Sequence, residues 1–358
     1  MKQLFGYFLR FLMFLSLGLL IMFLLYRSMS KGHYEQCALD GLSPEECGTL
    51  VEKVANDFAT ADFFWLFVVV FLFMLSNVSR AIRWNLLIDP LGRKPRFLNS
   101  LGAIMVGYFA NLGIPRIGEF VRAGVLSRYE KIEVGRVMGT VAIDRAVDLV
   151  SIMIMTVLAI TLQYQQIWDK LVELLSLDTL TKLFIAAGVA GALGLGLFFL
   201  LRKRIEKTKL YAKVVDLLRG VIEGLGSIRK LKKPGLFIFH SIAIWVLYYL
   251  LNYLCFFSFE PTSHLMPLVG LAVFVFGAWG IVIPTPGGMG SYHYLTVVAL
   301  SIYGISQPVG FSYTMISFLT ITVGGHVLFG LISLLILPFY NQNYNPVPID
   351  GAAQADKG

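Results

Sequence analysis

Charge is scarce in this sequence. Only 15% of its 358 residues are Asp, Glu, Lys or Arg, whereas 57% are hydrophobic, and soluble domains carry about 25% charged residues. No Lys or Arg occurs from Ile238 to Pro338, where Glu260 is the one acidic residue. These absences exclude an ordinary soluble domain and indicate an integral membrane protein.

The net charge of +8 would fit a nucleic-acid partner, but its distribution argues against one. The basic residues gather at the ends of apolar runs, as they do in the cytoplasmic loops of membrane proteins. We therefore expect no nucleic acid among the partners, and we expect contact with membrane lipids that carry anionic headgroups.

Cysteine and histidine are also few. Cys37 and Cys47 share an acidic segment, where they either form a disulfide in an oxidising compartment or remain free thiols. Four histidines fall in the uncharged C-terminal half of the chain: His240, His264, His293 and His326. Their spacing matches no metal-ligand signature, so no metal site and no cofactor are expected.

Long hydrophobic runs are what the sequence has in abundance. A membrane-spanning helix needs about 20 mostly apolar residues, and the runs that meet this length are 4–26, 62–88, 137–163, 183–201, 236–257 and 311–338. No small-x-small cleavage site follows the first run, which is therefore expected to be a retained anchor. Two further apolar stretches, 97–130 and 265–304, are interrupted by Gly and Pro.

The loops between these runs predict the orientation. Segment 28–61 has two basic residues against six acidic ones, which is typical of an outside loop, whereas Arg93, Lys94 and Arg96 mark an inside loop. Segment 202–233 has eleven basic residues against three acidic ones and is either an amphipathic helix on the cytoplasmic leaflet or a solvated loop helix. The polar tail 339–358 is expected to be disordered. Both termini are then cytoplasmic, in a bacterial plasma (inner) membrane.

The order of the runs indicates an internal repeat. Residues 62–163 and residues 236–338 each contain a span, an interrupted stretch and a second span, and the matching starts lie about 170 residues apart. The first unit starts outside and the second inside, so the repeats are predicted to be inverted, with each interrupted stretch forming a re-entrant hairpin. The alternative is that two Pro/Gly breaks arose at similar spacing by chance.

The second break contains the sequence PTPGGMG. Such backbone is tolerated at membrane depth only where protein or a water-filled cavity covers it, and its N–H groups, followed by a helix starting near Ser291, would suit a phosphate. The alternative is a tight bend with no ligand. The residues predicted to contact a substrate here are Pro284, Pro286, Gly287, Gly288, Gly290, Ser291 and His293.

Charged residues within the apolar sequence form a second candidate site. An Arg or Asp at the centre of a bilayer costs about 2.5–3.5 kcal/mol on insertion scales. Arg116 and Arg122 are predicted to bind the substrate phosphate, because Glu119 can neutralise only one of them. The other members are predicted to form a supporting network: Arg80, Arg83, Asp144, Arg145 and Asp148. Arg80 and Arg83 could instead extend toward the lipid headgroups.

Four motifs carry a resemblance to a known family. They are RAIRW at 80–84, N-x3-P-R-x-G-E-x2-R at 111–122, G-T-V-x2-D-R-x2-D at 139–148 and P-x-P-G-G-x-G at 284–290. Together they resemble the transmembrane domain of bacterial lysylphosphatidylglycerol synthases/flippases and of stand-alone flippase-like membrane proteins. The resemblance implies movement of a lipid, such as an aminoacylated phosphatidylglycerol, between leaflets. It implies no synthase activity, since nothing resembles the soluble aminoacyl-transferase domain, and His293 stands where the family usually has Glu.

The sequence thus predicts an all-α polytopic membrane protein, with about six full spans and two re-entrant helical hairpins in inverted repeats. Residues 1–338 would form the flippase-like transmembrane domain. The predicted function is transport of a phosphate-bearing lipid rather than catalysis. The alternatives are a membrane-embedded enzyme that acts on lipid headgroups, with Glu119, Asp144 or His293 as general base, and a non-transporting assembly partner.

Overall fold

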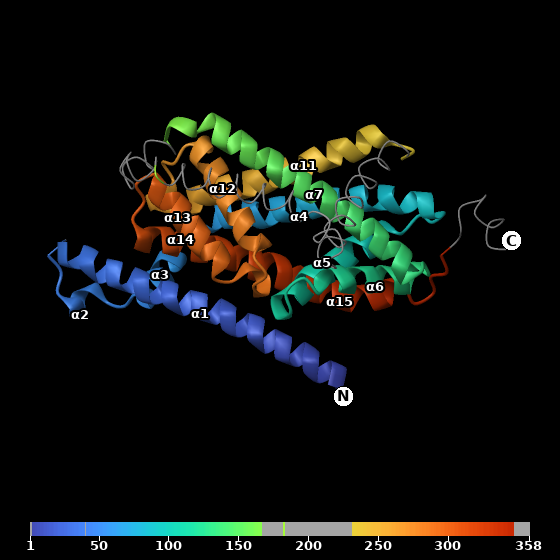
Figure 1. Ribbon diagram of the computed structural model, residues 1–358, viewed down its shortest axis with the longest axis horizontal. Helices are drawn as coiled ribbons and strands as arrows, with labels where there is room; N and C mark the ends of the chain where they lie inside the picture. The colour runs from blue at the N-terminus through green and yellow to red at the C-terminus, as the bar shows by residue number, and fades with distance from the viewer. Residues whose placement is uncertain (1, 40, 167–181, 183–230, 347–358) are drawn as a thin grey trace.

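The computed structural model describes residues 2–39, 41–166, 182 and 231–346, and the described part of the chain is helical throughout. Figure 1 shows the long helices running along the long axis of the molecule, with α1 at one edge. The α-helices are α1 (Lys2–Leu39), α2 (Pro44–Cys47), α3 (Leu50–Ala59), α4 (Phe63–Ile88), α5 (Phe97–Gly113), α6 (Gly118–Glu130), α7 (Val134–Leu162), α11 (Pro234–Leu254), α12 (Pro267–Val282), α13 (Ser291–Ile302), α14 (Gln307–Leu319) and α15 (Leu328–Tyr340).

Four helical segments among the described residues are long and apolar enough to cross a membrane. They contain α4, α7, α11 and the continuous helix α14–α15, in which a π-helix occupies Thr320–Val327. Four of the six predicted spans are therefore matched by helices of spanning length. The predicted anchor 4–26 falls within α1, which is not one of these four, and the span 183–201 lies outside the described residues, as does nearly all of the basic segment 202–233.

The two interrupted stretches each form a pair of short helices. The first contains α5 and α6 with Pro115 in the turn between them, and the second contains α12 and α13 with Pro284 in the turn. The longest of the four, α5, has 17 residues and extends about 26 Å at 1.5 Å per residue. The hydrocarbon core of a bilayer is about 30 Å thick, so each helix is shorter than a full span.

Small residues let the two members of each pair approach closely. A Cβ atom added to Gly107 of α5 would lie 2.8 Å from the carbonyl oxygen of Gly118 in α6, and one added to Gly280 of α12 would lie 2.7 Å from Cα of Tyr292 in α13. The Asn111 side chain closes the first turn by accepting a hydrogen bond of 2.7 Å from the Gly118 N–H. The Pro and Gly positions therefore determine both where the chain turns and how tightly it returns.

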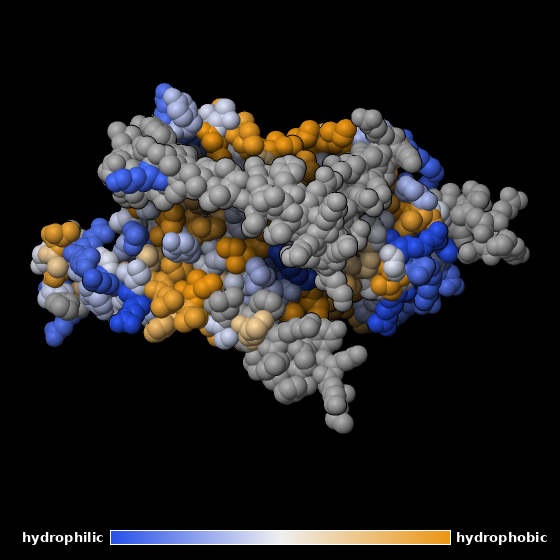
Figure 2. Space-filling model, viewed as in Figure 1, coloured by the Kyte–Doolittle hydropathy of each residue, from blue (hydrophilic) through white to orange (hydrophobic). Residues whose placement is uncertain are grey.

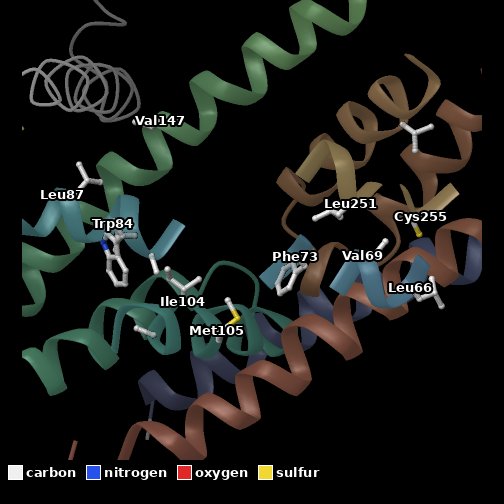
Figure 3. Close-up of a cluster of buried hydrophobic side chains, with 14 of the residues drawn as sticks. Leu66, Val69, Phe73, Trp84, Leu87, Ile104, Met105, Val147, Leu251 and Cys255 are labelled. Carbon is white, nitrogen blue, oxygen red and sulfur yellow. The ribbon is translucent and has the colours of Figure 1, made fainter. Parts of the chain in front are cut away.

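The apolar core joins helices that are distant in the sequence. Figure 3 shows Phe73 and Trp84 of α4 lying beside Ile104 and Met105 of α5, with Val147 of α7 nearby. Trp84 is fully buried, and its indole N–H donates a hydrogen bond of 2.9 Å to the Thr140 hydroxyl of α7. This packing fixes α4 against α5 and α7.

The segment predicted as an outside loop, 28–61, is mostly helical. The end of α1, α2 and α3 fill it. Capping boxes start both short helices, in which Ser43 pairs with Glu46 and Thr49 pairs with Glu52. A disulfide joins Cys37 of α1 to Cys47 at the end of α2. The Cys47 sulfur lies 3.4 Å from Nε2 of His33.

The hydrophilic ends of the molecule lie at opposite extremes of its long axis. On the face shown in Figure 2, hydrophilic residues gather near α2 at the left and toward the C-terminal end at the right, with hydrophobic residues between them. The N-terminal end of α1, the turn after α4 and the end of α15 all lie toward the right end in Figure 1. This separation of polar ends by an apolar middle is the shape expected for a membrane protein.

The first residues of the predicted disordered tail are held to the fold. The Tyr344 hydroxyl donates a hydrogen bond of 2.8 Å to the buried carboxylate of Glu130, and the Arg96 guanidinium lies 3.6 Å from the Tyr344 ring centroid. Glu130 also accepts from the Arg96 N–H and from the Asn99 amide, at 2.9 and 2.6 Å. The segment after α15 therefore covers the start of α5 and the end of α6.

Replacing Gly107 by Ala should destabilise the α5–α6 pair by about 1–3 kcal/mol, because the new Cβ would meet backbone rather than a flexible side chain. Thermal unfolding in detergent measures this loss. Gly124→Ala in α6 is the matched control, since no atom lies within 4 Å of its added Cβ, and it should be neutral or stabilising. Equal melting temperatures for the two variants would contradict the close approach of the helices.

Replacing Tyr344 by Phe should cost about 1–2 kcal/mol, because it removes a hydrogen bond to a buried carboxylate. Burial and the Glu130 hydrogen bond raise the pKa of Tyr344 from 10.0 to about 12. The neutral phenol is thus the form that stabilises the fold, and its contribution is complete below pH 10 and is lost as the pH rises through about 12.

Unfolding of the Tyr344→Phe variant is compared with that of Tyr340→Phe, whose ring also lies under Arg96, at 5.0 Å. Tyr340→Phe should have little effect. Equal losses for the two variants, or a Tyr344→Phe loss that persists at pH 12 and above, would contradict the role of the Glu130 hydrogen bond.

Candidate functional site

Five buried charged side chains from three helices form the candidate site, which we call the arginine–aspartate cluster. Arg80 and Arg83 come from α4, Arg122 from α6, and Asp144 and Asp148 from α7. Arg83 lies about 8 Å before the end of α4 and Asp144 about 15 Å after the start of α7, at 1.5 Å per residue. The cluster therefore sits inside the helical bundle, away from the ends of the helices.

Asp144 is the centre of the cluster. Its Oδ1 accepts two hydrogen bonds from the Arg83 guanidinium, from Nη2 and Nε, at 2.6 and 3.0 Å, and such charge-assisted bonds are stronger than neutral ones. Its Oδ2 accepts from Nη2 of Arg122 at 2.8 Å and from Nη1 of Arg80 at 3.3 Å. One carboxylate therefore joins α4, α6 and α7.

Asp148, one turn further along α7, repeats part of this pattern. Its Oδ2 accepts a hydrogen bond of 2.7 Å from Nη1 of Arg80, and its Oδ1 accepts one of 2.7 Å from Nη2 of Arg83. The i, i+4 spacing of Asp144 and Asp148 puts both carboxylates on one face of α7. Two aspartates thus share two arginines of α4, and Arg122 is the additional cation.

The cluster has one more positive charge than negative. Its three guanidinium groups expose 4% or less of their side chains, while Asp144 is fully buried and Asp148 is 13% exposed. Nε of Arg80 and Nε of Arg122 are buried and find no hydrogen-bond acceptor among the described residues. A net positive charge with unused donors in an apolar bundle is suited to bind an anion.

Arg145 and Glu119 form the half-exposed rim of the cluster. Arg145 Nε lies 3.6 Å from Glu119, and its Nη2 lies 3.5 Å from both Asp144 and Asp148. Arg145 therefore contacts an acid of α6 and both aspartates of α7. Since one acid and one base are added, the rim leaves the excess charge at +1.

Aromatic rings hold the guanidinium groups from the other side. Arg122 lies 4.7 Å from the Trp84 ring centroid and Arg80 lies 5.8 Å from that of Tyr248 in α11. The Tyr248 hydroxyl lies 3.3 Å from the hydroxyl of Tyr108 in α5. Sequence reasoning missed Trp84, Tyr108 and Tyr248, because a single aromatic residue in an apolar helix gives no signal of its partner.

The structure separates the two arginines that were predicted to act together. Arg122 belongs to the buried cluster, whereas Arg116 is exposed at the turn between α5 and α6, with a positive φ of 63°. Arg116 Nη2 donates a hydrogen bond of 2.9 Å to the Val282 carbonyl at the end of α12, so it links the two turns. Arg80 and Arg83 are buried, so the alternative that they extend to the headgroups is not what the structure shows.

The PTPGGMG turn contains three glycines with positive φ, which are Gly287, Gly288 and Gly290. Several of its N–H groups are already used: those of Gly288 and Met289 donate to carbonyl oxygens within the turn, and that of Gly290 donates to Nδ1 of His293 at 3.4 Å. The geometry of a tight bend is therefore clear. A phosphate bound by this backbone remains a prediction, with fewer free N–H groups than the sequence suggested.

Other elements cover this turn. A Cβ atom on Gly287 would lie 2.9 Å from Leu112 of α5, and one on Gly290 would lie 2.9 Å from Ile21 and 3.1 Å from the Gly18 carbonyl of α1. Pro286 is buried and Pro284 is exposed. Protein therefore shields most of the irregular backbone, as its depth in a membrane would require.

Helix α13 begins at Ser291, as predicted, and its first turn is buried. The Ser291 hydroxyl donates a hydrogen bond of 2.7 Å to the Gly280 carbonyl of α12. The His293 ring is fully buried, packs 4.6 Å from the Phe318 ring centroid, and its Nε2 has no partner among the described residues. The structure thus places His293 behind the turn rather than in the arginine–aspartate cluster.

One group in the described part of the chain has the spacing of metal ligands, and it contains His33, Cys37 and Cys47. Its two sulfurs are joined in the disulfide, whereas metal coordination by cysteine requires thiolates. Nδ1 of His240 is hydrogen-bonded to the Ser79 hydroxyl at 2.7 Å, and the His326 ring centroid lies 5.1 Å from that of Tyr108. These histidines have separate structural neighbours.

Comparison with known proteins agrees with the sequence motifs. Residues 47–335 match the family described as the lysylphosphatidylglycerol synthase TM region. The UPF0104 membrane protein MJ1595 of Methanocaldococcus jannaschii is 23% identical over 294 residues, which is 76% of this chain and 84% of that protein. No solved structure matches significantly. The matched region runs from the end of α2 into α15 and contains the whole arginine–aspartate cluster, so this multi-pass membrane protein belongs to the lysylphosphatidylglycerol synthase TM region family.

Proposed function

We propose that the protein binds the phosphate of an anionic lipid at the arginine–aspartate cluster and moves that lipid between leaflets. The observation that carries the proposal is the excess guanidinium in the buried cluster, where Arg122 shares Asp144 with two other arginines. A buried charge excess is costly unless a counter-ion compensates it. A lipid phosphate would supply that charge and accept hydrogen bonds from the free Nε donors of Arg80 and Arg122.

The proposed transport uses an inverted repeat. Helices α4, α5, α6 and α7 correspond to α11, α12, α13 and α14–α15, and the matching helices start 171, 170, 173 and 173 residues apart. Each short pair, α5–α6 and α12–α13, would enter the membrane and return to the same side. Inverted repeats with broken segments at matching positions are the arrangement of many secondary transporters, in which one repeat rocks against the other.

Arg116 would couple the two hairpins in this scheme. Its side chain reaches from the first turn to the Val282 carbonyl at the end of α12, and its αL backbone is strained for a residue other than glycine. Movement of one hairpin would therefore pull on the other. A role of Arg116 in contacting the phosphate directly remains part of the proposal, because its exposed side chain can also reach a headgroup.

The rival proposal is an enzyme that acts on lipid headgroups, with a buried carboxylate as general base. Asp144 is tied to three arginines, which favours its ionised form and makes it a poor proton acceptor. The two functions are separated by one assay, in which lipids are recovered from each leaflet of proteoliposomes and their headgroups are analysed. Altered headgroups would favour the enzyme, and unaltered lipid in the opposite leaflet would favour transport.

Replacing Arg122 by Gln should reduce lipid transfer at least tenfold, because it removes the excess charge of the cluster. Transfer is measured in proteoliposomes with a leaflet-specific reagent for an anionic lipid. Arg128→Gln is the matched control, since Arg128 lies on the same helix with an exposed side chain, and it should transfer at the normal rate. Normal transfer by a correctly folded Arg122→Gln variant would rule out the cluster as the phosphate site.

Single cysteines introduced at positions 35, 94 and 350 test the proposed orientation. We expect position 35 to react with an impermeant maleimide added to intact cells, because it lies in the acidic segment at the α2 end of the molecule. Positions 94 and 350 should react only after permeabilisation, because Lys94 belongs to a basic loop. Reaction of position 94 in intact cells would show that the inverted arrangement is wrong.

A further inference from the structure

Four buried side chains from three helices in the second half of the molecule carry neutral oxygen atoms, and we call them the oxygen cluster. They are Asn252 of α11, Tyr292 and Thr296 of α13, and Ser317 of α14. Tyr292 and Asn252 are 6% exposed, Ser317 is 1% exposed and Thr296 is fully buried. The Tyr292 hydroxyl lies 3.0 Å from Oγ of Ser317. Thr296 follows Tyr292 by one turn on the same face of α13, and a Cβ atom added to Gly277 would lie 2.8 Å from the Tyr292 ring and 3.3 Å from Oγ1 of Thr296.

Hydrogen bonds do not satisfy every oxygen of the cluster. Ser317 uses its hydroxyl hydrogen on the Thr314 carbonyl, at 3.1 Å, so Tyr292 donates the hydrogen of the bond between the two hydroxyls. Oδ1 of Asn252 and Oγ1 of Thr296 have no hydrogen-bond partner among the described residues. Each unsatisfied buried oxygen costs about 1–3 kcal/mol. Something with positive charge or spare hydrogens would remove that cost.

The chemistry of these oxygens favours a monovalent metal cation. All four are neutral amide or hydroxyl oxygens, and the one acidic residue between positions 238 and 338, Glu260, is exposed. Divalent cations are bound chiefly through carboxylates, whereas neutral oxygens in a broken-helix region coordinate Na⁺ in transporters built from inverted repeats. We infer that Asn252, Tyr292, Thr296 and Ser317 form a binding site for a monovalent cation, with Na⁺ as its probe.

The position of the oxygen cluster supports this inference, in a step that rests on the proposed repeat. Asn252, Tyr292 and Ser317 lie 169, 170 and 169 residues after Arg83, Arg122 and Asp148. The matching helices α4, α6 and α7 carry the arginine–aspartate cluster, and α11, α13 and α14 carry the oxygen cluster. In the first repeat the positive charge belongs to the arginine side chains. In the second repeat a cation bound from solution would supply it.

A bound cation would add a contact among α11, α13 and α14, which few side-chain hydrogen bonds connect. The Tyr292–Ser317 hydrogen bond connects α13 with α14, and the Tyr313 hydroxyl of α14 donates a hydrogen bond of 3.0 Å to the Asn252 carbonyl of α11. Cation binding would therefore stabilise the packing of α13 against α11 and α14, and cation release would loosen it.

The test is direct binding of ²²Na⁺ to the purified full-length protein in detergent, in choline chloride of constant ionic strength. We expect saturable binding that excess unlabelled Na⁺ displaces, together with a higher melting temperature in NaCl than in choline chloride. Thr296→Val keeps the shape of the side chain and removes the oxygen, and it should weaken Na⁺ binding at least tenfold. Thr314→Val is the matched control, because Thr314 is equally buried and its hydroxyl bonds only to the Gly310 carbonyl of its own helix.

Two outcomes would overturn the inference. If the unaltered protein binds no Na⁺ saturably, the oxygens are satisfied by a buried water instead. If Thr296→Val and Ser317→Ala both bind Na⁺ normally, the cation lies elsewhere. The result is independent of lipid transfer, since Arg122→Gln should abolish transfer and leave ²²Na⁺ binding unchanged, whereas Thr296→Val should weaken ²²Na⁺ binding. Should Thr296→Val fail to fold, the unaltered protein and Ser317→Ala still decide the question.

Discussion

The organisation of the first half of the molecule depends on the carboxylate of Asp144. It is fully buried and it contacts arginines of α4 and α6 from its own position on α7. In an apolar bundle, none of these charges can be left alone without a desolvation cost of several kcal/mol. The helices must therefore stay in the register that keeps all the partners in contact, and the Trp84 ring, stacked on Arg122 and bonded to Thr140, fixes the same register from the apolar side.

The second half of the molecule is organised by different forces. Its helices carry almost no charge, and many of its buried polar groups are hydroxyls that bond to backbone carbonyls. Close contacts at Gly270, Gly277 and Gly280 let α12 approach Tyr253 and Tyr292. Packing of small residues therefore holds the helices of this half together, whereas ion pairs do so in the other half. Replacing a neutral polar contact here should cost less stability than breaking a buried ion pair there.

Length and composition were sufficient to predict α4, α7, α11 and the α14–α15 helix, because a membrane span is defined by a continuous apolar run. The breaks were also predictable, since Pro115 and Pro284 each stand close to glycines in the middle of apolar sequence, and proline removes a hydrogen bond from a helix interior. The charged residues were recognisable because a charge in apolar sequence is costly, but the sequence did not show which of them form ion pairs. Arg80 and Asp148 are 68 residues apart, and which faces of two helices meet depends on the packing of the whole bundle.

Two further features of the structure were not predicted, and the first of them had a signal in the sequence. The helices of the segment 28–61 begin at Ser43-Pro-Glu-Glu46 and Thr49-Leu-Val-Glu52, and each sequence has the Ser/Thr-x-x-Glu spacing of a capping box. The assignment of Arg116 and Arg122 to one phosphate followed from their charge, because Glu119 can neutralise only one of them. Arg116 lies instead in the turn before α6, so the two side chains do not share a helical face.

The contact of α1 with the PTPGGMG turn has a consequence for biosynthesis. Gly18 and Ile21 of α1 lie against Gly290, although about 270 residues separate them, and α1 precedes the region that matches the family. At 5–20 residues per second, roughly 14–54 s pass between the synthesis of the two surfaces. Helix α1 is therefore without this partner while most of the chain is made, and the irregular backbone of the turn gains its cover only when the two meet.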